Sequence, residues 1–358
     1  KQYKLGYNAL GSLSTLDANN NDAISSGGTG FIAECARSFW TPTALDAYWT
    51  DRPQGSCLTP NTAQSETPDG NIVEKGAQGY KLRTTIANPD DRLVYTCSSG
   101  CTAATPTLFN SSNAAITKGL LGNAAMTDAE RIKLIDWARG KNVDNELGKG
   151  TTVMRPSVHG DVVHSRPVAI NFGTGDTLAT SNVVVFYGGN DGMLHAFNAS
   201  DIGAGGGTER WAYVPSMVMK NLHRLADKDY DTKHRYFVDG SPVTGDVQAG
   251  TWKTILVGGL AGGGAGYYAL DITNQAAPKV LWELRQKTGC TASTTPRFTS
   301  SARMTEDCDL GYSYGNPVIT KLPNGTWTVM VTSGYNNHSG GDGVGYLYIL
   351  DAISGTIL

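Results

Sequence analysis

A unit of about 75 residues repeats in the second half of the chain, and this repeat limits the possible folds more than any other feature. The dipeptide Pro-Val begins at Pro167, Pro242 and Pro317. In each unit an apolar stretch that ends in glycine follows, and then a second apolar stretch that has a glycine before it. A stretch that contains a tryptophan, Trp211 or Trp282, closes the first two units. Short apolar stretches between turn residues predict β-strands, four in each complete unit.

Four-stranded units that repeat radially are typical of a β-propeller. The sequence therefore predicts an all-β fold with propeller blades over residues 151–358, in which the units begin near residues 165, 240 and 315. The third unit stops at Leu358, just before its tryptophan stretch is due. Because a closed ring needs at least ~4 blades, we expect the propeller to be incomplete in this chain.

Residues 1–150 differ from the repeat region in their sequence pattern, which is irregular and rich in Asn and Thr. One helix is predicted there, near residues 127–139. Its signals are a capping box, one apolar face and a glycine after the last turn: Thr127 with Glu130; Ala129, Ile132, Ile135 and Ala138; and Gly140. We expect this helix to be structural and to pack against the repeat region.

The composition excludes several classes of protein. The chain is 40% hydrophobic and 17% charged, whereas a disordered chain has low hydrophobicity with high net charge, and a coiled coil is rich in Glu, Lys and Leu. A formal charge of −3 is too balanced to predict nucleic acid or an anionic membrane surface as a partner. No apolar stretch approaches the ~18 residues of a membrane-spanning helix. Because the chain starts at Lys1 without methionine or an apolar signal segment, we expect a mature exported chain or an excised piece of one.

The six cysteines fall into three local couples: Cys35 with Cys57, Cys97 with Cys101, and Cys290 with Cys308. We expect disulfides formed in an oxidising compartment, which would fasten loops that have little core of their own. Six free thiols are the alternative. A zinc site is disfavoured, because the Cys-x3-Cys spacing has no second pair of Cys or His at finger spacing.

A candidate calcium loop lies near the N-terminus. Asp17, Asn19 and Asn21 offer oxygens at alternate positions, as in an EF-hand loop, and Asp22 follows them. The loop lacks the glycine at position six, where Asp22 stands, and the glutamate at position twelve, where Gly28 stands. The alternative is a solvated, Asn-rich turn.

Three patterns resemble catalytic or cofactor sites, but each has a stronger structural explanation. Residues 311–315 match Gly-x-Ser-x-Gly, yet a strand follows instead of the helix that a nucleophile elbow needs. The glycine-rich stretch 258–266 also leads into a strand, which favours a turn over a phosphate loop. His159 and His164 are five residues apart on a predicted strand and point to opposite faces, so a metal site with His195 is disfavoured. We therefore predict no catalytic or cofactor-binding residue.

Five blocks of the sequence carry a resemblance to a known family: residues 68–76, 158–167, 186–197, 234–242 and 258–271. They resemble the PilC/PilY family, the type IV pilus biogenesis and tip-adhesin proteins of Gram-negative bacteria. The resemblance covers roughly residues 35–358. It implies a C-terminal, quinoprotein-like propeller of a large exported protein.

The resemblance also implies a function. Such a protein sits at the pilus tip or outer membrane, contacts minor pilins, opposes pilus retraction and attaches to a host or abiotic surface. The family is described as holding calcium in an Asp-x-Asp-x-Asp-x-x-x-Asp loop of a late blade, and this loop cannot be assigned to any residue here. The expectation is therefore a non-enzymatic pilus assembly factor and adhesin.

Two other functions share parts of the pattern. A pyrroloquinoline-quinone dehydrogenase also has blades that close with tryptophan and turns like residues 351–355. Such enzymes are expected to join two adjacent cysteines, and no two cysteines are adjacent here. A propeller that binds a protein or a glycan through its loops, without a role in pili, shares every feature of the sequence.

Overall fold

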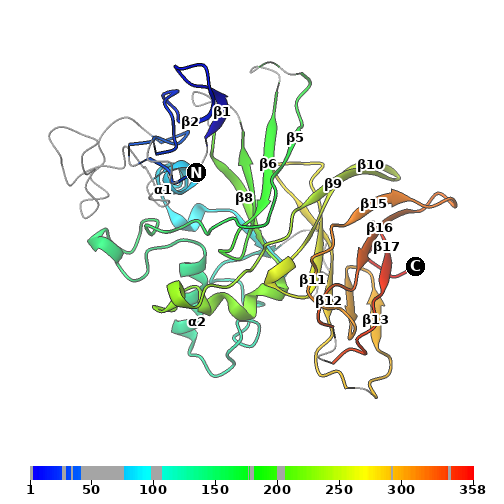
Figure 1. The fold of residues 1–358 in the computed structure, drawn as a ribbon. Helices are drawn as coiled ribbons and strands as arrows, with labels where there is room; N and C mark the ends of the chain where they lie inside the picture. The colour runs from blue at the N-terminus through cyan, green and yellow to red at the C-terminus, as the bar shows by residue number, and fades with distance from the viewer. Residues whose placement is uncertain are drawn as a thin grey trace.

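Three β-sheets, one for each sequence repeat, follow one another in the order of the chain (Figure 1). The computed structural model describes residues 3–25, 30–33, 35–41, 76–97, 107–175, 177, 181–199, 206–291, 293–337 and 340–358. A two-stranded hairpin and a set of helices precede the repeats in the chain.

Each sheet is built around the strands of one repeat, and consecutive strands of a repeat pair antiparallel. The strands are β5 (Val168–Asn171), β6 (Val183–Gly188), β7 (Leu194–Asn198) and β8 (Glu209–Val214) in the first sheet; β9 (Val243–Ala249), β10 (Thr251–Gly259), β11 (Gly266–Asp271) and β12 (Lys279–Gln286) in the second; and β15 (Val318–Lys321), β16 (Trp327–Thr332) and β17 (Leu347–Asp351) in the third. This arrangement confirms the predicted blades and the incomplete third unit.

The first two sheets contain six strands each, two more than the four that the sequence predicts for each repeat. In the first sheet, β3 (Val94–Thr96) pairs parallel with β8 and antiparallel with β4 (Thr107–Leu108). In the second sheet, β14 (Met304–Asp307) pairs parallel with β12 and antiparallel with β13 (Phe298–Ser301). All four residues of β13 are exposed, so it carries no apolar alternation by which the sequence could have revealed it.

The remaining elements lie before the repeats or in the loops between strands. They are β1 (Lys4–Tyr7), β2 (Leu13–Leu16), α1 (Ala77–Thr85), α2 (Asp128–Ala138), and the 3-10 helices η4 (Pro89–Asp91), η5 (Glu146–Gly148), η7 (Ser216–Arg224), η8 (Tyr230–Thr232) and η9 (Ala261–Gly263). No helix in the described ranges is long and apolar enough to cross a bilayer.

Helix α2 is the helix predicted near residues 127–139, and both of its predicted caps are present. The Thr127 hydroxyl accepts from the Glu130 N–H, and the Glu130 carboxylate accepts from the Thr127 N–H at 2.7 Å. Gly140 adopts φ +100°, which lets the chain turn away after the last helical turn.

The predicted apolar face of α2 was only half correct. Ile135 and Ala138 are buried, but Ala129 and Ile132 are exposed. The buried residues of the helix all lie in its C-terminal half. Packing, and not the apolar periodicity, therefore decides which residues of α2 reach the core.

The hydrophobic core crosses the predicted domain boundary at residue 150. Phe109, Ile116 and Ile135 share one cluster of buried side chains with Trp211 and Tyr213 of the first sheet. Strand β3 and helix α2 therefore pack together with the repeat strands of the first sheet.

Two buried tryptophans join neighbouring sheets. The indole Nε1–H of Trp211, in β8, donates to the Gln275 carbonyl of the second sheet's β11–β12 turn at 2.8 Å. The indole of Trp282, in β12, donates to the Ala352 carbonyl just after β17 at 3.0 Å. Gly355 adopts φ +72°, and a Cβ there would lie 2.4 Å from Trp282, so the turn that receives the indole requires glycine. Each tryptophan therefore fastens its own sheet to the next one.

We predict that Trp211→Ala lowers the free energy of unfolding by about 3–5 kcal/mol, because the ring is fully buried between two sheets. Equilibrium unfolding in urea measures the loss. Trp252→Ala is the comparison, since Trp252 is 59% exposed and loses only its edge-to-face contact with Trp327, so its cost should be smaller, about 0.5–1.5 kcal/mol. Equal midpoints for wild type and Trp211→Ala would remove this ring from the core.

Candidate functional site

A histidine and three charged partners are buried where the N-terminal segment meets the first sheet. His195, in β7, lies 2.8 Å from Glu209 through Nδ1 and 3.0 Å from Asp191 through Nε2. The Arg92 guanidinium donates two hydrogen bonds to Glu209, at 2.7 and 2.9 Å. We call these four residues, Arg92, Asp191, His195 and Glu209, the buried histidine cluster.

The geometry of the first sheet positions the cluster. Asp191 lies in the β6–β7 turn, where one carboxylate oxygen accepts from the Met193 N–H, so the carboxylate faces the ring four residues later. Glu209 is the first residue of β8, the strand that pairs with β7. Arg92 just precedes β3 and also donates to the Arg139 carbonyl at the end of α2. The cluster therefore ties the segment before β3 and the end of α2 to the repeat strands of the first sheet.

Electrostatics within the cluster favour the charged forms of all its members. Burial opposes the imidazolium, but the carboxylates of Asp191 and Glu209 outweigh it and raise the pKa of His195 to about 9. Burial also opposes the Glu209 carboxylate, yet Arg92 and His195 lower its pKa to about 2. The pKa of Asp191 is likewise held below its usual range, despite burial, by His195. His195 is thus protonated at neutral pH and donates from both ring nitrogens.

A second histidine, His159, covers the ring of His195. The two rings are stacked with centroids 4.7 Å apart. Burial, followed by the charge of His195, lowers the pKa of His159 to about 4, so its ring is neutral. A neutral ring donates from Nδ1 to the Gly160 carbonyl at 2.6 Å and accepts at Nε2 from the Tyr187 hydroxyl at 2.8 Å.

This arrangement leaves no ring nitrogen of His159 or His195 open to a substrate or a metal. His164, the third histidine considered in the sequence, lies elsewhere and pairs with Asp239 at 2.7 Å. Within the described ranges no three His, Cys, Asp or Glu side chains are grouped in a way that could hold a metal ion. The ring nitrogens of His159 and His195 therefore connect segments around the first sheet, whereas His164 is bonded to Asp239 of the next repeat.

Sequence reasoning missed Arg92, Asp191 and Glu209. Two signals were available: Glu209 is an acidic residue at the start of the Trp211 stretch, and Asp191 stands four residues before a histidine. Arg92 had no such signal, because its partner lies 117 residues further along the chain.

The candidate calcium loop forms a hydrogen-bonded turn. The buried Asp17 carboxylate accepts from the backbone N–H groups of Asn19, Asn21 and Arg37. The side-chain oxygen of Asn19 accepts from the Arg37 guanidinium at 2.6 Å, and the Asp22 carboxylate accepts from the amide of Asn8. In this conformation the side-chain oxygens of Asp17, Asn19 and Asp22 accept from N–H donors, and a calcium site in this loop stays a prediction.

The Gly-x-Ser-x-Gly and glycine-rich stretches meet in the structure. Ser313 is buried, accepts from the Leu260 N–H at 2.9 Å and donates to the Gly266 carbonyl at 2.6 Å. The serine therefore fastens the β10–β11 turn to the loop before β15 and is not presented as a nucleophile.

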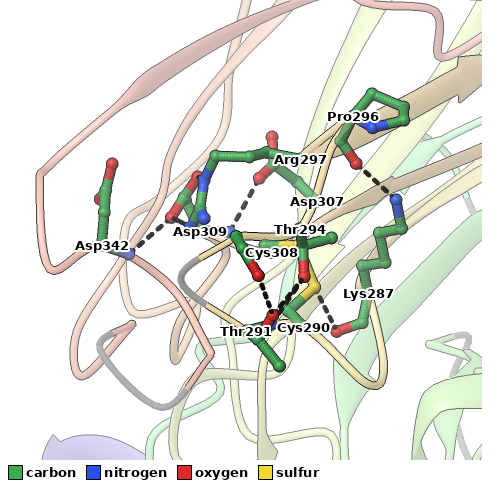
Figure 2. Close-up of a disulfide and its surroundings, with 11 residues drawn as sticks. Lys287, Cys290, Thr291, Thr294, Pro296, Arg297, Asp307, Cys308, Asp309 and Asp342 are labelled. Carbon is green, nitrogen blue, oxygen red and sulfur yellow. Dashed lines mark hydrogen bonds and ion pairs between the residues drawn. A yellow bond between two sulfur atoms is a disulfide. The ribbon is translucent and has the colours of Figure 1, made fainter.

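A disulfide between Cys290 and Cys308 closes the segment that contains β13 and β14, as expected from the sequence (Figure 2). Beside it, Arg297 pairs with the Asp309 carboxylate through Nε at 2.8 Å, and Asp309 accepts from the Asp342 N–H. The disulfide and this ion pair close the base of the β13–β14 hairpin, and the Asp342 N–H bond connects it to the third sheet's β16–β17 loop.

Two further cysteines, Cys35 and Cys97, are also disulfide-bonded. Cys57 and Cys101 lie outside the described residues. The pairings of Cys35 with Cys57 and of Cys97 with Cys101 therefore stay predictions.

Comparison with known proteins relates the chain to pilus proteins. The family described as PilY1 beta-propeller domain matches residues 165–358. A type IV pilus biogenesis factor PilY1 of Pseudomonas aeruginosa strain PAO1 is 33% identical over 203 residues, which are 51% of this chain and 15% of that protein. A PilY1 homolog of Xylella fastidiosa strain Temecula1 is 35% identical over 178 residues, 49% of this chain and 10% of that protein. The chain thus matches only a small part of the length of these relatives.

Among solved structures, the crystal structure of the Pseudomonas aeruginosa PilY1 C-terminal domain is similar to the chain. It shares 34% sequence identity, and the match covers 49% of this chain and 29% of that one with a TM-score of 0.34.

The two histidines predict a stability optimum between acid and alkaline pH. His195 has a folded pKa of about 9, above its unfolded ~6.5, so its contribution is full below pH ~6.5 and is lost as the pH rises through about 9. His159 has a folded pKa of about 4, so its contribution is full above pH ~6.5 and is lost as the pH falls through about 4. Thermal unfolding measured across this range should give the highest melting temperature near pH ~6.5.

The variant His195→Gln tests the alkaline half of this profile. It should flatten the loss of stability on the alkaline side, and it should also change the acid side, because the charge of His195 contributes to the lowered pKa values of His159, Asp191 and Glu209. Ring-proton NMR of wild type checks the same pKa without a substitution. A ring of His195 that titrates near ~6.5 would contradict the charged cluster.

For the disulfide, we predict that replacing both Cys290 and Cys308 by serine lowers the free energy of unfolding by about 3 kcal/mol, because the bond closes a loop with a sequence separation of 18. Peptide mapping under non-reducing conditions should show the two cysteines in one linked peptide. Free thiols at both positions would refute the pairing and argue against an oxidising compartment.

Proposed function

Because the chain belongs to the PilY1 beta-propeller domain family, we propose that it serves a larger exported protein as a non-enzymatic module for type IV pilus assembly and surface attachment. The parent protein promotes pilus extension by opposing retraction. The family match across the three repeated sheets is the observation that carries this proposal. The proposed partners are minor pilins at the pilus tip and a host or abiotic surface.

The buried sites support a binding role over a catalytic one. Both ring nitrogens of His195 are occupied by carboxylates, and Ser313 is fixed between two turns. Chemistry on a substrate needs such groups to be accessible, whereas a rigid set of sheets that presents loops is suited to binding. The proposal is therefore a scaffold whose exposed loops contact partners.

The disulfides support an exported location. Disulfides persist in the periplasm and at cell surfaces and are rare in the cytosol. Within the described residues no cysteine is free. We place the parent protein at the pilus tip, cell surface or outer membrane, after passage through the periplasm.

The first test is deletion of the parent gene in its source organism, with surface pili counted by electron microscopy. We expect few or no pili, because retraction is then unopposed. A second strain that also lacks the retraction motor should regain them, and a strain carrying the restored gene is the control. Unchanged pilus numbers in both deletion strains would contradict a role in pilus biogenesis.

A further inference from the structure

Equivalent loops of the three repeats lie next to one another. His164, Asp239 and Tyr314 each stand three residues before a Pro-Val pair. The backbone N–H and Nδ1 of His164 both contact the Asp239 carboxylate, at 3.3 and 2.7 Å. Beside this pair, the Arg166 N–H donates to the Ser241 hydroxyl at 2.9 Å. The repeat therefore brings together loops that are 75 residues apart.

Aromatic rings collect on these loops and on the neighbouring β16–β17 loop. The ring of Tyr236 lies 5.2 Å from His164 and 5.3 Å from His234. The rings of Tyr312 and Tyr314 stack with centroids 6.4 Å apart, and the backbones of Tyr312 and Tyr335 exchange two hydrogen bonds. We call these six residues the aromatic rim: His164, His234, Tyr236, Tyr312, Tyr314 and Tyr335.

The glycine-rich turn between β10 and β11 connects the two halves of the rim. A Cβ on Gly262 would lie 2.7 Å from the ring of Tyr236, and the Gly264 carbonyl accepts from the Ser313 N–H. The pKa of Tyr314 is raised by partial burial and by its neighbours Asp239, Tyr312 and Tyr236. Glycines in this turn therefore add no side chains that would cover the rings on either side.

The rim is open to solvent. Tyr335 is 71% exposed and Tyr314 is 57% exposed, while Tyr236 and Tyr312 are 38% exposed. Exposed tyrosines supply large, rigid apolar faces together with a hydroxyl group that stays hydrated. A surface of this kind suits a ligand that is apolar on one side and carries hydrogen-bonding groups around it.

The charges beside the rim argue against a basic peptide as that ligand. The Asp161 carboxylate is occupied by His234 and by the amide of Asn190, and the Asp239 carboxylate is occupied by His164. Both carboxylates are therefore already paired. What remains exposed on these loops is the set of aromatic faces and tyrosine hydroxyls together with Arg166 and Arg235, which can donate hydrogen bonds to hydroxyl groups. No unpaired carboxylate of Asp161 or Asp239 is left to attract a cationic ligand.

From this geometry we infer that the aromatic rim binds uncharged pyranose sugars of surface glycans. A pyranose has an apolar face of C–H bonds that stacks on an aromatic ring, and equatorial hydroxyls that hydrogen-bond to tyrosine and histidine. The inference names the ligand class for the surface attachment proposed above and rests on that proposal.

The test uses the purified full chain on a printed array of uncharged and sialylated glycans, followed by calorimetric titration with the strongest uncharged hit. The double variant Tyr314→Ala/Tyr335→Ala should weaken binding by about tenfold or more, because two stacking faces are lost. Tyr7→Ala is the matched control, since Tyr7 is 74% exposed in β1 and should leave binding unchanged. Circular dichroism confirms that each variant folds, and Tyr314→Phe, which keeps the ring, should retain most of the affinity.

Several results would overturn the inference. These are an array with no uncharged glycan bound, binding confined to sialylated glycans, and equal affinity of the double variant and Tyr7→Ala. A strain that carries the double variant separates this inference from the proposed function. Wild-type pilus numbers with reduced attachment to glycan-coated surfaces support it, whereas loss of pili in that strain would assign the rim to assembly and overturn the sugar inference.

Discussion

The indole N–H groups of Trp211 and Trp282 provide the contact on which the arrangement of the sheets depends. A buried indole needs an acceptor, and each finds a backbone carbonyl just beyond the third strand of the next sheet. The same bond joins the first sheet to the second and the second to the third. Equivalent residues of successive repeats are therefore placed in the same way relative to each other. The contact between His164 and Asp239, which are 75 residues apart, follows from that constant placement.

Buried charge adds further links of a different kind. Glu283 of β12 accepts from the Tyr213 hydroxyl and the Ser216 N–H, so it joins the first two sheets, and burial raises its pKa despite these donors. The buried histidine cluster joins the segment before β3 and the end of α2 to the repeat strands of the first sheet. Burying ions costs free energy that their pairing offsets only when the geometry is good, so removing one partner of such a link is strongly destabilising. Here the paired groups come from segments that are distant in the chain.

The sequence was informative where local rules decide the structure. Strand order, the helix caps at Thr127 and Gly140 and the Cys290–Cys308 bond all follow from spacing and residue type. Prediction was incomplete where distant segments meet. The parallel pairing of β3 with β8 and the reach of Arg92 to Glu209 leave no periodic trace, and the exposed half of α2 depends on what packs against it. The aromatic rim is an intermediate case, since the repeat aligns His164 with Tyr314 but does not show that the rings are exposed.

The extra hairpins have a consequence for the behaviour of the chain among its own copies. The last strand of an open sheet offers unpaired N–H and C=O groups on which another molecule can add a strand, a route to aggregation. Strands β3 and β14 occupy that position beside β8 and β12. At this edge of the two sheets the outermost strands are then β4, with two residues, and β13, with four, and strands this short are poor templates for pairing; β5 and β9 form the opposite edges. The disulfide that fastens β13 and β14 is thus also a guard, at this edge of the second sheet, against intermolecular sheet growth.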